Sequence, residues 1–191
     1  MPNTTELPIL PFESKKKFAD WLAKNHDKST GLWLKIPKKA AGISTVTYAE
    51  ALDVALCYGW IDGQKGSFDE QYFLQKFTPR RAKSIWSKIN VEKVEGLIAS
   101  GEMKPAGLKA VEAAKQDGRW AAAYASQKNM EVHVDFQSAL NKNKKAKAFF
   151  ETLTGSRRYS FLFRIETAKK AETREKRIRQ FVEMLERGET F

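Results

Sequence analysis

Residues 60–77, Trp-Ile-Asp-Gly-Gln-Lys-Gly-Ser-Phe-Asp-Glu-Gln-Tyr-Phe-Leu-Gln-Lys-Phe, hold two segments of strand-forming residues around a glycine-rich middle. The pattern predicts one strand that starts at Trp60 and a second over residues 71–77, with a turn at Gly63–Gly66. A third strand is predicted over residues 31–37, where apolar residues alternate as far as the proline at its end. These strands most simply pair as a small antiparallel sheet with helices packed on one face, which is an α+β arrangement.

Helices are predicted on both sides of these strands. Ser14 is a candidate N-cap for a helix that ends near residue 25, and Thr47 is a candidate N-cap for a helix that Gly59 ends. After residue 79, apolar residues recur at helical spacing almost to the end of the chain. Further helix starts are predicted at Asn90, Pro105, Asp135 and Ser156, and helix ends at Gly101, Gly118 and Gly155. We therefore expect an α+β domain at residues 1–130, opened by an irregular proline-containing arm, and an all-α domain at residues 131–191.

Composition places the chain among globular proteins. It has 191 residues, of which 42% are hydrophobic, and a single cysteine, which excludes an internal disulfide. No apolar run approaches the length of a membrane-spanning helix. The first residues lack the basic and apolar regions of a secretory signal, so we expect a cytoplasmic protein.

The charge is strongly positive and uneven. The net charge is +11, and residues 142–191 alone carry 14 Lys and Arg against 7 Asp and Glu. Such a surface attracts polyanions through counterion release, so nucleic acid is a candidate partner. The polyanion-binding candidates are Arg157, Arg158, Lys169, Lys170, Arg174 and Arg177. The simpler interpretation is a solvated helical face, because glutamates interleave with these cations.

Most catalytic signatures are absent from the sequence. The two histidines lie far apart with no second ligand nearby, and one cysteine cannot build a zinc site, so no metal or cofactor is predicted. The glycines at 59, 63 and 66 do not form a dinucleotide-binding motif, and neither a P-loop nor G-x-S-x-G occurs. Cys57 ends an amphipathic helix, where packing is a better explanation than a nucleophilic role.

The strongest candidate for a site is a pair of segments that flank the predicted strands, at residues 59–63 and 78–90. A hairpin would bring Asp62 within ion-pair reach of Arg80, beside two indoles and several small hydrogen-bonding groups. The ligand-binding candidates are Trp60, Asp62, Arg80, Ser84, Trp86, Ser87 and Asn90. The alternative is structural: the ion pair would fix the hairpin, the amide would cap a helix and the indoles would fill a core.

Several motifs together resemble one bacterial family. They are Ala55–Gly63, Phe77–Asn90, Gly101–Gly107, Ala114–Trp120, Asp135–Leu140 and Ala168–Ile178. This ordered series resembles the YdeI/OmpD-associated family, also called bacteriocin-protection proteins, over nearly the whole chain. The resemblance implies a small helical C-terminal domain and a role in tolerance of bacteriocins or antimicrobial peptides, with no established reaction or cofactor.

Three functions follow as alternatives. The first is a non-enzymatic stress or bacteriocin-tolerance protein that binds a small ligand or a protein partner at the residues around Trp60 and Arg80. The second is a nucleic-acid-associated protein that uses its basic C-terminal helices. The third is an enzyme of unknown reaction, for which the sequence offers only the predicted pocket.

Overall fold

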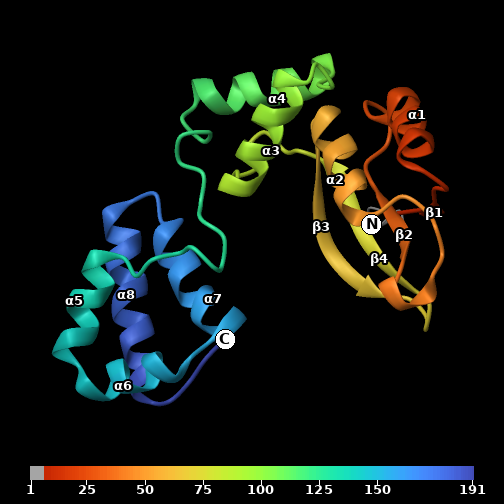
Figure 1. Ribbon diagram of the computed structural model, residues 1–191. Helices are drawn as coiled ribbons and strands as arrows, with labels where there is room; N and C mark the ends of the chain where they lie inside the picture. Colours follow the sequence, from red (N-terminus) through yellow and green to blue (C-terminus); the bar gives the residue numbers. More distant parts are fainter. Residues whose placement is uncertain (1–6) are drawn as a thin grey trace, which may run out of the picture. The chain divides into compact units, whose positions relative to one another are not determined.

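The computed structural model describes residues 7–191, which form two compact units (Figure 1). The first unit runs to Trp86 and also contains Asn90–Ala122, and the second comprises Ser87–Ile89 and Ala123–Phe191. The first unit contains the sheet and four α-helices, and the second contains helices only. The predicted α+β fold with a helical C-terminal region is confirmed.

A four-stranded sheet organises the first unit, in the order β1-β2-β4-β3. The strands are β1 (Ile9–Pro11), β2 (Leu32–Pro37), β3 (Trp60–Ser67) and β4 (Tyr72–Pro79). The three predicted strands pair antiparallel, whereas β1 pairs parallel to β2 and makes the sheet mixed. β1 falls in the segment that was predicted to be an irregular arm. Its three residues are too short to show an alternating pattern.

The turn predicted at Gly63–Gly66 is wrong, because β3 continues through both glycines to Ser67. The register of β3 against β4 shifts between Asp62 and Lys65, so the glycines mark an irregularity within the strand. The connection between the strands lies instead at residues 68–71. There Asp69 accepts hydrogen bonds from the backbone N–H groups of Gln71 and Tyr72.

One face of the sheet is covered by α1 (Lys15–Asn25) and α2 (Tyr48–Cys57). The register places Leu32 opposite Phe77, and both side chains are fully buried on this inner face. Phe18 of α1 packs with its ring centroid 5.7 Å from that of Phe77. The alternating pattern of β2 arises from this one-sided cover, because every second residue of the strand is buried.

The predicted caps of both helices are confirmed. Ser14 accepts a hydrogen bond from the backbone of Lys17 at the start of α1. Thr47 and Glu50 form a full capping box at the start of α2, in which each side chain bonds the other residue's backbone N–H. Pro105 is the first residue of its helix, as predicted.

Two more helices complete the first unit, α3 (Lys88–Ala99) and α4 (Pro105–Gln116). α4 approaches the end of α2 so closely that a Cβ built at Gly107 would overlap the carbonyl oxygen of Cys57. Gly59 has a φ of 74°, and a Cβ there would lie 2.9 Å from the carbonyl oxygen of Ala106. Glycine is therefore required at both positions, where two backbones meet.

The second unit is built around aromatic side chains on four helices. These are α5 (Val134–Lys142), α6 (Lys144–Thr152), α7 (Gly155–Glu166) and α8 (Ala171–Glu186). Phe136, Phe150, Phe161 and Phe181 are buried in one cluster, with edge-to-face contacts between them. The cap predicted at Asp135 is wrong, because His133 caps α5. α7 begins one residue before the start predicted at Ser156, at Gly155, so that glycine begins a helix instead of ending one.

Candidate functional site

The two indoles of the predicted cluster are buried in different surroundings. Trp60 donates a hydrogen bond from its Nε1 to the carbonyl oxygen of His26 and contacts the Trp21 ring edge-to-face at 5.9 Å. Trp86 packs instead against Trp120, with ring centroids 4.8 Å apart. Each indole therefore has a packing role, which is the structural alternative considered for this cluster.

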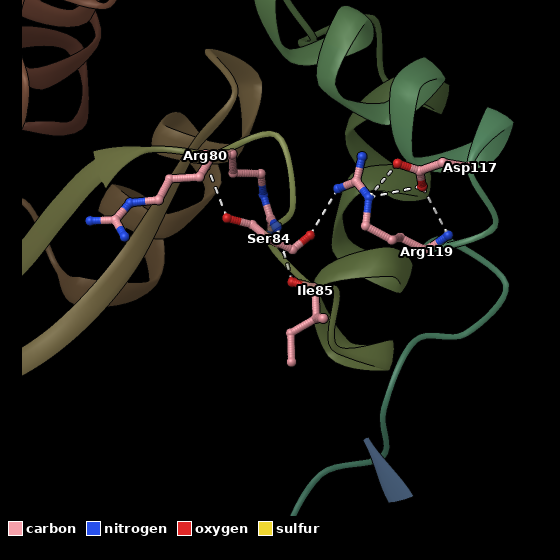
Figure 2. A network of polar contacts seen from close by, with 6 residues as sticks. Arg80, Ser84, Ile85, Asp117 and Arg119 are labelled. Atoms are coloured by element: carbon pink, nitrogen blue, oxygen red, sulfur yellow. Dashed lines mark hydrogen bonds and ion pairs between the residues drawn. The ribbon is translucent and has the colours of Figure 1, made fainter. Parts of the chain in front are cut away.

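Arg80 and Trp86 are brought together by the turn that follows β4. The guanidinium carbon of Arg80 lies 3.5 Å from the Trp86 ring centroid, which is a close cation–π contact. Arg80 also donates a hydrogen bond to the carbonyl oxygen of Ile85 (Figure 2). Its backbone N–H donates a further hydrogen bond to the carbonyl oxygen of Gly59. The arginine thus closes residues 80–86 into a compact turn over the indole.

Ser84 joins this turn to the segment after α4, as Figure 2 shows. Its hydroxyl accepts a hydrogen bond from the backbone of Arg81, and its carbonyl oxygen accepts one from Arg119 at 2.8 Å. The Arg119 Nε in turn binds Asp117 through both carboxylate oxygens, at 2.7 and 2.8 Å. These contacts hold the turn in place and give Ser84 a structural role.

The last two residues of the predicted cluster lie at the start of α3. Ser87 forms an isolated parallel bridge with Tyr124. α3 begins at Lys88, so the helix cap predicted at Asn90 is wrong and that residue lies in the first turn. A ligand-binding role for the cluster as a whole stays a prediction, as does an ion pair between Asp62 and Arg80.

Asp62 contacts Tyr48, and that tyrosine lines a hollow that we call the Tyr48 cleft. It has a volume of about 410 Å³. Its lining comes from the end of β2, the following loop, the start of α2 and one residue of β4: Ile36, Pro37, Lys38, Lys39, Gly42, Ile43, Ser44, Thr45, Val46, Thr47, Tyr48 and Phe73. The Tyr48 hydroxyl donates a hydrogen bond of 2.8 Å to Asp62.

The Tyr48 phenol is a neutral hydrogen-bonding group. Burial, together with the hydrogen bond to the Asp62 carboxylate, raises its pKa well above the usual range. The phenol therefore stays protonated at any physiological pH, and the bond fixes its orientation beside the cleft. The pair supplies a positioned polar group next to an apolar lining, which is the usual chemistry of a small-molecule site.

Cys57 is buried at the end of α2, as predicted from its helical position. Burial, with a smaller contribution from the Glu102 carboxylate, raises the pKa of its thiol to about 11. Because the thiolate is the nucleophile, this cysteine is unreactive at neutral pH.

The basic residues of the second unit are divided between structural contacts and solvent. The guanidinium of Arg158 lies 4.2 Å from the Phe150 ring, and that of Arg177 donates to the carbonyl oxygen of Arg164. The Nη1 atom of Arg174 lies 4.0 Å from a carboxylate oxygen of Asp135. Arg157, Lys169 and Lys170 are exposed. The six candidates therefore do not all present free charge to one ligand, and their polyanion-binding role stays a prediction.

Within residues 7–191, a further hollow lies in the second unit. Arg158 lines this hollow, of about 420 Å³, together with Lys128 and Tyr159. Within this range, no group of three His, Cys, Asp or Glu side chains is arranged to hold a metal ion. The same residues include no helix with the length and apolar character needed to cross a bilayer.

The Tyr48 cleft was not predicted from the sequence, because residues 38–46, between β2 and α2, read as a loop of mostly polar and small residues. Its apolar lining is divided between segments distant in sequence, β2, β4 and the loop between β2 and α2. Only Ile43 and Val46, two apolar residues within that polar loop, offered a signal. Asp62 was identified, but with a partner other than the tyrosine that it contacts.

Comparisons with known families divide the chain in two. Residues 10–110 match the model of a domain of unknown function, DUF8412, and residues 129–188 match a model described as Bacteriocin-protection, YdeI or OmpD-Associated. The resemblance to the YdeI/OmpD-associated family is confirmed by the second match. The motifs at Ala55–Gly63 and Phe77–Asn90 fall within the first. No curated protein and no solved structure matches the chain.

Proposed function

Because the chain belongs to the DUF8412 family over residues 10–110 and carries a YdeI/OmpD-associated domain at residues 129–188, we propose that it is a non-enzymatic binding protein. Its ligand is a small molecule with an apolar body and an anionic group, held in the Tyr48 cleft. The role proposed for this binding is stress or bacteriocin tolerance in a bacterial cell, following the description of the C-terminal family.

The observation that carries this proposal is the lining of the cleft. A volume of about 410 Å³ lies within the range of small-molecule pockets. Ile36, Val46 and Phe73 supply apolar surface for the ligand body, and Lys38 and Lys39 supply positive charge beside it. This combination favours an amphipathic anion, because two ammonium groups beside the cleft attract negative charge.

The charge of the chain favours a small anion over a peptide. Many antimicrobial peptides are basic amphipathic helices, and a chain with a net charge of +11 repels them at long range. Direct capture of such a peptide is therefore disfavoured. Cys57 is disfavoured as a nucleophile, because its thiol is buried with a pKa raised to about 11.

A fluorescent amphipathic anion, 8-anilinonaphthalene-1-sulfonate, provides a direct test. The wild-type protein is expected to bind the dye saturably, with one site per chain. Ile43→Ser removes apolar lining from the cleft, and Ile98→Ser is the matched control in α3, since the two isoleucines are 36% and 39% exposed. Because burial of an isoleucine side chain is worth about 1.5–3 kcal/mol, Ile43→Ser is expected to weaken binding about tenfold.

The charged part of the site is tested in the same assay. Lys38→Gln combined with Lys39→Gln should weaken dye binding, and should also reduce its dependence on salt. Circular dichroism must show that each variant is folded, because partly unfolded proteins also bind this dye. Equal dye binding by Ile43→Ser and Ile98→Ser in folded protein would exclude the Tyr48 cleft as the site.

A further inference from the structure

The outer face of the sheet, opposite α1 and α2, carries aromatic rings and lysines side by side. The register places Trp33 of β2 beside Lys76 of β4, and Lys35 beside Leu74. These positions alternate with the buried inner-face residues of the same strands, so their side chains lie on the opposite face. The packed rings of α1 meet the inner face instead.

Each lysine of this face lies over an aromatic ring. The Nζ of Lys35 is 4.0 Å from the centroid of the Tyr72 ring and 4.5 Å from that of Phe68. The Nζ of Lys76 is 5.7 Å from the Trp33 ring. Phe68, in the β3–β4 connection, is 45% exposed. Aromatic surface and positive charge therefore reach solvent within one patch, which we call the Trp33 face: Trp33, Lys35, Phe68, Tyr72 and Lys76.

Glycines of β3 leave room beside the tryptophan. A Cβ built at Gly66 would lie 3.7 Å from the Trp33 ring, and one built at Gly63 would lie 3.7 Å from Lys76. Any other residue at Gly66 would place its side chain against the indole. The irregular, glycine-containing part of β3 thus keeps the ring edge uncovered on that side.

We propose that the Trp33 face binds a single-stranded polynucleotide: Lys35 and Lys76 leave the aromatic rings to hold phosphates, and bases stack on the rings in their place. Trp33 and Tyr72 lie on neighbouring strands, about four residues apart along the sheet by the register. At ~3.3 Å per residue this spacing is about 13 Å, so the rings can stack on different bases of one strand. A duplex hides its base faces and cannot use these rings.

The lysines make a polynucleotide a better occupant than a protein. Aromatic residues are common to both kinds of interface, but lysine is depleted at protein–protein contacts and enriched where phosphates bind. One carboxylate opposes this charge: Asp69 lies 3.9 Å from Lys35, at the edge of the patch. Lys76 has no such carboxylate among the ion pairs of the described residues, and the net charge of +11 supports association.

Fluorescence anisotropy of labelled dT12 and rU12 with the full chain tests the proposal. Saturable binding is expected at 20 mM salt, and a duplex of equal length should bind more weakly. Phe68→Ser should weaken binding about tenfold through lost stacking. Lys35→Gln combined with Lys76→Gln should reduce the log–log salt slope by about 1.4, since each phosphate contact on a single strand contributes about 0.7.

Lys144→Gln combined with Lys145→Gln is the matched control, because it removes equal charge from an exposed pair in the second unit that is not among the polyanion-binding candidates. This control should leave the salt slope unchanged. Acetylation footprinting of the wild-type protein gives a second measurement that needs no variant: the oligonucleotide should protect Lys35 and Lys76 but not Lys144. Absence of binding at 20 mM salt, loss of binding in the control pair alone, or equal acetylation with and without oligonucleotide would each overturn the proposal.

Discussion

Replacing Gly107 by alanine is expected to destabilise the first unit, although alanine is the better helix former. Gly107 lies in the first turn of α4, where a Cβ would overlap the carbonyl oxygen of Cys57 and lie 2.8 Å from that of Leu56. Both oxygens belong to the backbone at the end of α2, and neither can rotate away as a flexible side chain would. The methyl group therefore forces the two helices apart.

The magnitude follows from two opposing effects. Overpacking a close contact lowers the free energy of unfolding by about 1–3 kcal/mol. The Cβ at position 107 would meet backbone atoms, so we expect a loss at the upper end of that range. The gain in helix propensity from glycine to alanine offsets at most about 1 kcal/mol. We expect the free energy of unfolding to fall by about 2 kcal/mol, which is a large part of the stability of a small domain.

Urea denaturation followed by circular dichroism measures this loss, and Gly96 provides a matched control. Gly96 lies inside α3, and a Cβ built there has no heavy atom within 4 Å. Gly96→Ala should therefore raise the free energy of unfolding by up to about 1 kcal/mol through propensity alone. If Gly107→Ala is as stable as Gly96→Ala, the close approach of α2 and α4 does not exist as described.

Two further predictions concern α2. Thr47→Ala removes the capping box and should lower the free energy of unfolding by about 1 kcal/mol, measured by urea denaturation. The backbone N–H of Thr47, and after it the Thr47 hydroxyl, hold the pKa of Glu50 below its ordinary value. This contribution is present above the unfolded pKa and lost as the pH falls through the folded one, so Glu50→Gln should remove it, and an unchanged acid profile in that variant would contradict this. The buried Cys57 thiol, with its pKa raised to about 11, should react slowly with a thiol reagent at pH 7 and quickly in urea, and rapid native labelling would restore it as a candidate nucleophile.

Local signals in the sequence predicted much of the fold. The caps at Ser14 and Thr47 and the proline start of α4 were all correct, because each depends on a side chain and its own neighbouring backbone. The α+β class followed from alternating strands between helical segments. β1 was not predicted because three residues are too few to show an alternating hydrophobic pattern. Its pairing with β2 is a contact between segments distant in sequence, which no local pattern indicates.

The candidate site was less accessible to sequence reasoning for a related physical reason. Trp60 and Trp86 were grouped because both flank the predicted hairpin, yet each packs against an indole from another segment, Trp21 and Trp120. Nothing in the local sequence specifies which of several tryptophans will meet. Likewise, Gly63 and Gly66 were predicted to form a turn because glycine is common in turns, but both lie within β3.

The position of the Tyr48 cleft follows from how the helices cover the sheet. Phe18 and Trp21 of α1 pack toward Phe77 and Trp60, so the helical layer covers the inner face where these two residues lie. The inner-face pair Ile36 and Phe73 lies four residues further along the strands. There the loop before α2, instead of a helix, provides the cover, and both residues line the hollow under it. A loop fills space less completely than a helix face, so the end of the sheet nearest this loop is where a ligand can enter the inner layer.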